Sequence, residues 1–331
     1  MNAEQARLLE LVHEARPHLL AIGHETQIWL SRLEEQHDAL HGLVETLLTA
    51  EPALAVDLTA SLWRFWWLRG HMPEGRAFLE RARAIEGAAN AEILKGLGTI
   101  AFRQGDLGAA EEAFRERLQL AERRGEQRAI ADALADMART ALRRGDFAGV
   151  RTFAERGYEA AKDLGPDAVR GPLHLRAAAA RMEGRFDEAR VLYLESRAIN
   201  ERLGNEGNVA GEDHNLIYVA LHSGDRTEAE LRFRASSEWI FTHDDAYLRP
   251  YALLDAGVLA LHDGDLRRAG LLVASAQRIF EATGSIPDPD DRVELDNAIA
   301  RLKVELGEGF AVVWNEGGEL AWQEAQLLAG R

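Results

Sequence analysis

A glycine recurs along this chain at intervals of 35 to 40 residues, each time between two stretches rich in helix-forming residues. The segments are Arg69-Gly70-His71, Gln104-Gly105-Asp106, Arg144-Gly145-Asp146, Glu183-Gly184-Arg185, Ser223-Gly224-Asp225 and Asp263-Gly264-Asp265. A helix that ends in a tight reversal needs one residue at positive φ, which glycine adopts without a Cβ penalty. The Asp that often follows can cap the next helix. The spacing therefore predicts a stack of helix pairs.

The residues around these glycines keep the same phase over most of the chain. Small residues precede them by four positions at Ala101, Ala141, Ala180, Ala220 and Ala260, and by seven at Gly98, Ala138, Ala177, Ile217 and Gly257, where Ile is the exception. Mostly small residues follow them by five positions at Gly75, Ala110, Val150, Ala189, Ala229 and Ala269, and mostly larger ones by nine at Leu79, Phe114, Ala154, Tyr193, Phe233 and Val273. Small residues let the two helices of a pair approach closely, and the larger residue fills the gap between repeats.

This pattern resembles the tetratricopeptide repeat in its small position, its Ala and its aromatic position. The repeat length of about 40 residues resembles the long-helix variant of MalT-type bacterial transcriptional activators. The standard repeat places a tyrosine three residues after the Gly of its small position, and here Ala replaces it, as Ala101 does after Gly98. The ends carry a narrower resemblance, in Trp29-Leu30-x-Arg32-Leu33-Glu34, Leu62-Trp63-Arg64-Phe65-Trp66-Trp67, and Trp314-x-Glu316-Gly317. They look like the C-terminal repeat region of large bacterial regulators, which follows a switch ATPase and often accompanies a LuxR-type DNA-binding domain.

The ATPase itself is missing from this sequence. Its phosphate-binding loop needs a Lys followed by Ser or Thr. The lysines here are Lys95, Lys162 and Lys303, and none is followed by either residue. The resemblance therefore implies a repeat region without the nucleotide-binding or DNA-binding domain.

The predicted fold is all-α, a right-handed superhelical solenoid of antiparallel helix pairs. We expect one or two N-terminal helices within 1–50, with Gly23 as a break between them, repeats over 51–285, and capping helices over 286–331. The expected helices are 52–69 with 73–86, 88–104 with 107–124, 127–143 with 147–164, 167–183 with 186–203, 206–223 with 226–242, 246–262 with 266–283, and 290–306 with 308–328. About six or seven pairs result.

Composition restricts the possible partners. The formal charge of −16 argues against a general nucleic-acid surface, which needs clustered Lys and Arg. The absence of Cys excludes disulfides and thiolate metal sites. The sequence contains neither the apolar run of a membrane helix nor a signal-peptide core at its start. We therefore expect a cytoplasmic protein with no membrane partner and no cofactor.

Projecting the repeat places a set of mostly basic side chains on the inner face of the stack, contributed by the first helix of each pair. The set is Lys95, Thr99, Arg103, Arg139, Arg143, His174, Ala178, Arg181, His214, Tyr218, His222, Tyr251, Leu254 and His262. A positive groove in an acidic protein would attract a peptide or protein segment, including an acidic one, or a small anionic effector. The alternatives are that these Arg and His residues pair with neighbouring Glu and Asp, or that the helix faces are rotated from this projection.

The aromatic segment has two interpretations as well. Trp63, Trp66 and Trp67 share a helical stripe, which is typical of core between the N-terminal helices and the first repeat. If the same stripe were exposed, it would form a docking patch and would predict a homodimer.

Three smaller clusters carry weaker signals. His37 and His41 lie one helical turn apart beside Glu34, as metal ligands can, but no third ligand stands at a recognisable spacing. Glu212-Asp213-His214 is the best acid/base cluster, although adjacent residues on a helix point in different directions. Asp288, Asp290 and Asp291 are interpreted as a solvated loop and helix cap, because the spacing does not match a calcium loop.

The leading functional hypothesis is a non-catalytic helical-repeat protein that binds a partner on its inner face. Its link to transcriptional or signalling control comes from the resemblance alone. The alternatives are a self-associating structural module and, less favoured, an enzyme with a site in the groove.

Overall fold

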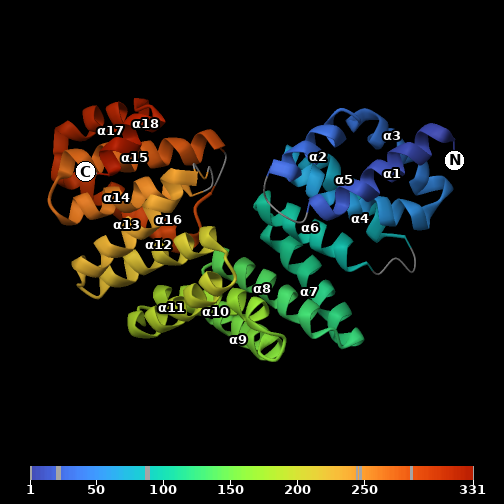
Figure 1. Ribbon diagram of the computed structural model, residues 1–331, viewed down its shortest axis with the longest axis horizontal. Helices are drawn as coiled ribbons and strands as arrows, with labels where there is room; N and C mark the ends of the chain where they lie inside the picture. The colour runs from blue at the N-terminus through green and yellow to red at the C-terminus, as the bar shows by residue number, and fades with distance from the viewer. Residues whose placement is uncertain are drawn as a thin grey trace. The chain divides into compact units, whose positions relative to one another are not determined.

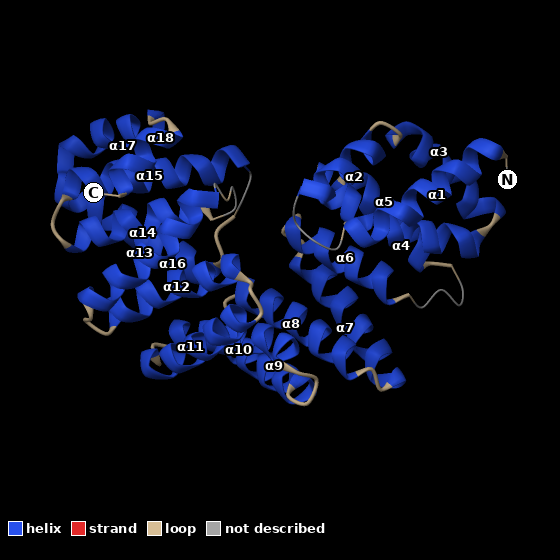
Figure 2. Cartoon of the chain, in the orientation of Figure 1, coloured by secondary structure: helices blue, strands red, loops and turns tan. Residues whose placement is uncertain are grey.

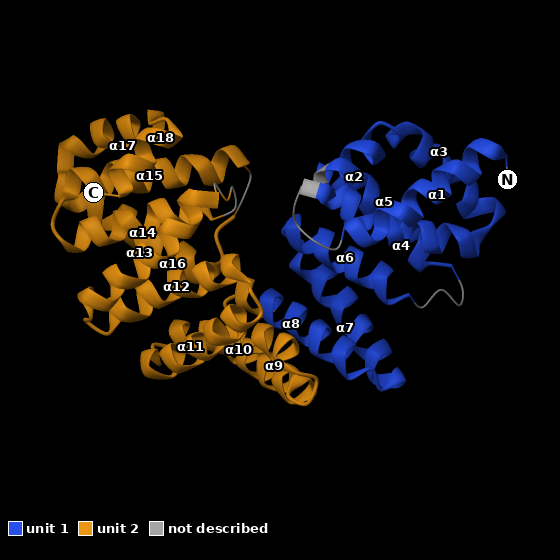
Figure 3. Cartoon of the chain, viewed as in Figure 1, with its two compact units in different colours: residues 1–140 blue, residues 141–331 orange. Residues whose placement is uncertain are grey.

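The computed structural model describes residues 2–19, 24–85, 90–243, 245, 248–283 and 286–330, so the break expected at Gly23 lies outside it. All the regular structure in these ranges is helical (Figure 2). The predicted all-α stack of antiparallel helix pairs is confirmed. The chain divides into two compact units, residues 1–140 and residues 141–331 (Figure 3). This division falls inside the range expected for the repeats, and the domain boundaries expected at 50 and 285 stay predictions.

Unit 1 begins with three helices rather than the expected one or two: α1 (Ala3–His18), α2 (His24–Glu34) and α3 (His37–Ala50) (Figure 1). Two pairs follow, α4 (Pro52–Arg69) with α5 (Met72–Arg83) and α6 (Ala91–Arg103) with α7 (Leu107–Arg124), and then α8 (Gln127–Arg143), which crosses the boundary between the units. Helices α1, α2 and α3 pack on α4, and their buried leucines share one core with Trp63, Phe65 and Trp66.

Unit 2 continues the pairing. Its helices are α9 (Phe147–Ala161), α10 (Pro166–Met182), α11 (Phe186–Arg202), α12 (Glu206–His222), α13 (Arg226–His243), α14 (Arg249–His262), α15 (Leu266–Thr283), α16 (Pro289–Leu306), α17 (Phe310–Glu319) and α18 (Trp322–Ala329). The last three pack on α14 and α15. The helix expected over 308–328 is divided, because Leu320 and Ala321 are extended and the Ala321 amide donates to the Glu324 carboxylate.

The recurring glycines form the reversals for which the sequence needed them. Gly105 and Gly264 have φ values of 79° and 80°. In each case the amide of the following Asp donates to the carbonyl of the Ala four residues before the glycine, at 2.9 Å for Asp106 and Ala101. The Asp106 side chain then accepts from the Ala109 amide at 3.0 Å and caps the next helix. The reversals at Gly105 and Gly264 therefore satisfy orphan groups of two helix ends at once, whereas His71 and Arg185, which follow Gly70 and Gly184, place no side-chain cap on the next helix.

The small residues before the glycines allow the close approach that was expected. A Cβ added to Gly98 would lie 2.3 Å from the Phe114 ring. A Cβ added to Gly257 would lie 2.7 Å from a Val273 methyl. Both contacts join the position seven before a recurring glycine to the position nine after it, one in each unit. The repeated phase in the sequence thus reflects a repeated contact.

None of the helices in the described ranges combines the length and the apolar character that crossing a bilayer requires.

Candidate functional site

The first turn of α16 lies against α10, α12 and α14 and brings three carboxylates into unit 2. Pro289 starts the helix at a position where a missing amide costs nothing. Asp290 and Asp291 follow in the first turn, where the helix dipole favours negative charge, and Glu294 lies one turn later. Asp290 and Asp291 are only 4% and 5% exposed. Their interpretation as a solvated loop and cap is therefore wrong, because they are buried against the repeats.

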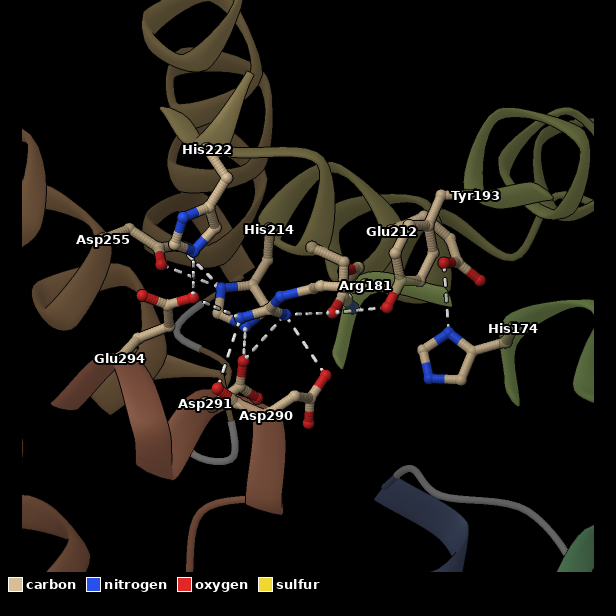
Figure 4. Close-up of polar contacts among 12 residues, drawn as sticks. His174, Arg181, Tyr193, Glu212, His214, His222, Asp255, Asp290, Asp291 and Glu294 are labelled. Atoms are coloured by element: carbon tan, nitrogen blue, oxygen red, sulfur yellow. Dashed lines mark hydrogen bonds and ion pairs between the residues drawn. The ribbon is translucent and has the colours of Figure 1, made fainter. Parts of the chain in front are cut away.

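Arg181 of α10 is the cation that these carboxylates meet (Figure 4). Its Nη1 lies 3.2 Å from Asp290 Oδ2 and 3.3 Å from Asp291 Oδ1, and its Nη2 lies 3.3 Å from Glu294 Oε1. The guanidinium is buried, donates to Asn215 Oδ1 at 2.8 Å and stacks over the Tyr218 ring. Burial alone would lower the pKa of Arg181, but Asp290 and Asp291 outweigh it and raise that pKa well above its ordinary value. Arg181 stays charged.

His214 of α12 is the second buried cation. Its Nδ1 lies 2.9 Å from both carboxylate oxygens of Asp255 on α14, and its Nε2 lies 3.1 Å from Asp291 Oδ1. Because both ring nitrogens face carboxylates, both must carry protons, and the ring is an imidazolium. Burial would lower the pKa of His214, but the charges of Asp255 and Asp291 outweigh it and raise that pKa to about 10.

Two further histidines lie at the edge of this cluster and are half-exposed. His222 Nε2 contacts Glu294 Oε1 at 2.8 Å, and its ring stacks on Phe186. His174 Nδ1 contacts Glu212 at 3.1 Å, and the buried Glu212 also accepts from the Ser196 hydroxyl at 2.6 Å. We use the name charged cluster for Arg181, His214, His222, Asp255, Asp290, Asp291 and Glu294.

The two aspartates of the α16 turn differ in character. Burial, together with the Asp291 charge next to it, raises the pKa of Asp290 to about 6, against the opposing effect of Arg181. Burial also acts to raise the pKa of Asp291, but the charges of His214 and Arg181 outweigh it and lower that pKa. The surroundings therefore stabilise the ionised form of Asp291 and destabilise the ionised form of Asp290.

The structure brings together part of the predicted groove set. Arg181, His214, Tyr218 and Tyr251 are buried around the α16 turn, and His222 lies at its edge. Arg143 Nη2 donates to the Ile286 carbonyl just before that turn, at 3.4 Å. Leu254 and Ala178 are buried core. The expected groove is not open to solvent at Arg181, His214, Tyr218 and Tyr251 in this structure, because the chain's own α16 and neighbouring helices cover these side chains.

Other members of the set are not part of the charged cluster. Lys95, Thr99, Arg103 and Arg139 belong to unit 1. There Arg139 pairs with Asp136 at 3.0 Å, and the Arg103 guanidinium lies over the Trp67 ring. His262 is exposed for the most part, and the partial burial of its ring, together with the nearby Arg301 charge, lowers its pKa.

The acids of the charged cluster, which are Asp255, Asp290, Asp291 and Glu294, are not identified from the sequence as partners of its basic residues. Asp255 was detectable, because it is a lone charge in the otherwise apolar run Tyr251–Leu261, which the structure buries throughout. Such a charge needs a buried partner. The triplet Glu212, Asp213 and His214 is buried, but its members contact different partners, with Asp213 held by Arg197 and Arg232 at 2.8 and 3.0 Å. It is not a preformed acid/base pair.

The proposed docking patch is wrong for two of its three tryptophans. Trp63 and Trp66 are each 2% exposed and belong to the core of unit 1, as the alternative interpretation had it. The Trp66 indole donates to Glu74 at 3.1 Å. Trp67 is half-buried and stacks on Trp63.

His37 and His41 both contact Glu74 of α5, each at 3.1 Å, so they tie α3 to the first repeat. Glu34 contacts His71 instead, at 3.0 Å. Within the described ranges, no group of three or more His, Asp or Glu side chains has an arrangement that could hold a metal ion.

Comparison with known proteins shows the fold and no family. No protein-family model matches the chain, and no curated protein matches it. It is similar to the solved structure of the apo form of RapI, with a TM-score of 0.60 at 10% identity over 88% of this chain and 99% of that one. The structure of a Rap protein complexed with competence and sporulation factor has a TM-score of 0.61 at 14% identity, over 98% of this chain and 88% of that one. The structure of a tetratricopeptide repeat protein from Parabacteroides merdae ATCC 43184 has a TM-score of 0.57 at 13% identity, over 86% of this chain and 99% of that one.

Proposed function

We propose that this protein is a non-catalytic helical-repeat protein that binds a peptide or protein segment on the side of α10, α12 and α14 where the charged cluster lies, which we call the first-helix face. The observation that carries the proposal is the placement of Arg181 and His214, two buried cations, on this face within an acidic chain. Both form contacts suited to carboxylates.

The structural neighbours support the class of function. One of them is a Rap protein solved in complex with competence and sporulation factor, so a chain of similar fold accommodates a bound factor. By the sequence resemblance we further propose a role in bacterial transcriptional or signalling regulation, in the cytoplasm, beside a separately encoded ATPase or DNA-binding subunit. The self-association alternative loses its main argument, because Trp63 and Trp66 are buried.

A photo-crosslinking amino acid tests the proposal. Placed at His174, which is half-exposed on α10, it should capture a defined partner in extract from the source cells. Placed at Val191, which is 64% exposed on the second helix α11, it should capture little of that partner. Replacing His222 with Glu should weaken capture at 174, because it puts a negative charge at the edge of the site. Equal capture from both positions, or capture from Val191 alone, would overturn the proposal.

A further inference from the structure

Helix α16 is held in two chemically different ways along its length. From Leu295 onward, Leu295, Ala298 and Leu302 are buried in the apolar core shared with α14 and α15. Before that point, the first turn is held by the charged contacts of Asp290, Asp291 and Glu294. The first turn can therefore leave its place while the apolar part of the helix stays packed.

The first turn is also an imperfect occupant of its site. Asp290 and Asp291 are adjacent like charges, both buried, and both compete for the same Nη1 atom of Arg181. Asp288 adds a further negative charge, and it places no side-chain cap on the helix. Buried ion pairs barely repay the cost of desolvation even when their geometry is good. The net free energy that holds this turn is therefore small enough for a competing acidic partner to supply.

Its departure would leave a preformed cationic site. In the described part of the chain, the carboxylates that contact Arg181 all come from α16. Without them, Arg181 keeps Asn215 and the Tyr218 ring, while His214 keeps Asp255 and exposes Nε2. His222 loses Glu294. Figure 4 shows the side chains of Arg181 and His214 converging on the α16 turn.

We propose that the first turn of α16 is an internal stand-in for the partner, and that an acidic segment carrying two adjacent carboxylates and a third one turn later displaces it and binds Arg181, His214 and His222. The inference rests on the proposed function and names the chemistry of the partner. The chain's own segment is the template, since Asp290, Asp291 and Glu294 have this spacing and already occupy the site. The contact is then autoinhibitory, and partner affinity depends on how often the turn is displaced.

The test uses the full chain with Asp290→Asn, Asp291→Asn and Glu294→Gln, which weakens the internal occupant. The probe is a fluorescent synthetic peptide covering residues 286–297, and binding is followed by fluorescence anisotropy. The control peptide carries the same three changes. A charge-matched control protein carries Asp296→Asn, Glu305→Gln and Glu308→Gln, which are exposed carboxylates outside the cluster.

We expect the triple variant to bind the acidic peptide at least about tenfold more tightly than the wild-type chain or the control protein does, because its site is open a larger fraction of the time. The control peptide should bind at least about tenfold more weakly than the acidic one. Equal affinity of the triple variant and the control protein, or equal affinity for the two peptides, would overturn the proposal.

A second measurement does not depend on the folding of the variant. Excess acidic peptide added to the wild-type chain should increase hydrogen exchange at residues 290–294 and leave residues 298–304 protected. The control peptide should leave exchange unchanged in both segments. Unchanged exchange at saturating acidic peptide contradicts the displacement. If a cellular partner crosslinks at position 174 but does not change this exchange, the proposed displacement of the α16 turn is wrong and the proposed function stands.

Discussion

The tryptophan core of unit 1 and the charged cluster of unit 2 fill the space between helices with opposite chemistry. In unit 1 the fit is one of shape, because Gly75 and Gly96 leave room for the Trp66 and Trp63 side chains, and an added Cβ would lie 2.6 and 2.8 Å from them. In unit 2 the fit is one of charge, with Arg181 and His214 set against carboxylates from α14 and α16. The packing in unit 1 does not depend on pH and tolerates only side chains of the right volume. The charged contacts in unit 2 depend on pH, and carboxylates from another molecule could take the place of those from α16.

The largest expected effect comes from leaving the acids of the cluster unpaired. Arg181→Met keeps the approximate length of the side chain and removes its charge, so Asp290, Asp291 and Glu294 lose their shared cation. We expect the free energy of unfolding, measured by urea denaturation, to fall by about 3–5 kcal/mol. Adding Asp290→Asn to this variant should restore part of the loss. A fall below about 1 kcal/mol would show that the cluster is already solvated.

A smaller effect tests the role of shape in unit 1. Gly75→Ala should destabilise the protein by about 1–3 kcal/mol, because its methyl group would overlap Trp66. The matched control is Gly108→Ala in α7, where the nearest atom, an Asp106 carboxylate oxygen, is 3.7 Å away. That change should be neutral or stabilising by up to about 1 kcal/mol, since Ala is the better helix former. Similar thermal shifts for the two variants would contradict the close packing.

The pH dependence separates the two chemistries. The folded-state pKa of His214 is raised to about 10, so its stabilising effect is fully present below pH 6.5 and is lost as the pH rises through 10. Between pH 7.5 and 9.5, urea denaturation should show a loss of about 1 kcal/mol per pH unit, since one proton is released on unfolding. A His214→Gln variant should lack this slope. A wild-type slope that matches the variant's would show that the imidazolium is not part of the fold.

The smallest effect is expected on the surface of α16. Arg292 pairs with Asp296 at 2.9 Å, and both side chains are about half exposed. Arg292→Ala should change stability by no more than about 0.5 kcal/mol, because solvent screens such pairs. A loss comparable to that of Arg181→Met would remove the distinction between buried and exposed charge on which the comparison depends.

The repeat and its helix ends could be predicted from the sequence because they depend on local chemistry. Gly105 and Gly264 adopt positive φ as expected, and the helices expected at 52–69, 107–124 and 266–283 have the same bounds in the structure. The extended break at Leu320 and Ala321 was missed, because Ala321 carries no capping side chain.

The candidate site could be predicted only in part. The cations Arg181, His214 and His222 were found, since they recur on the same side of the first helices. Their acidic partners were not assigned, because Arg181 and Asp290 are separated by 109 residues, and no helical periodicity links them. Adjacent aspartates at the start of a helix have the same sequence pattern in solvent as in a buried pair. Only tertiary packing distinguishes the two cases.

The glycine reversals have a consequence for how such a chain can change in length. The joint at Gly264, for example, is closed by atoms drawn from one short stretch, because the Asp265 amide donates to the Ala260 carbonyl and the Arg268 amide donates to the Asp265 carboxylate. Nothing outside that stretch is needed to form it. A gene duplication that copies one module from joint to joint therefore delivers a new helix pair whose turn already closes. Selection can then act on the side chains of the added pair without first repairing the backbone.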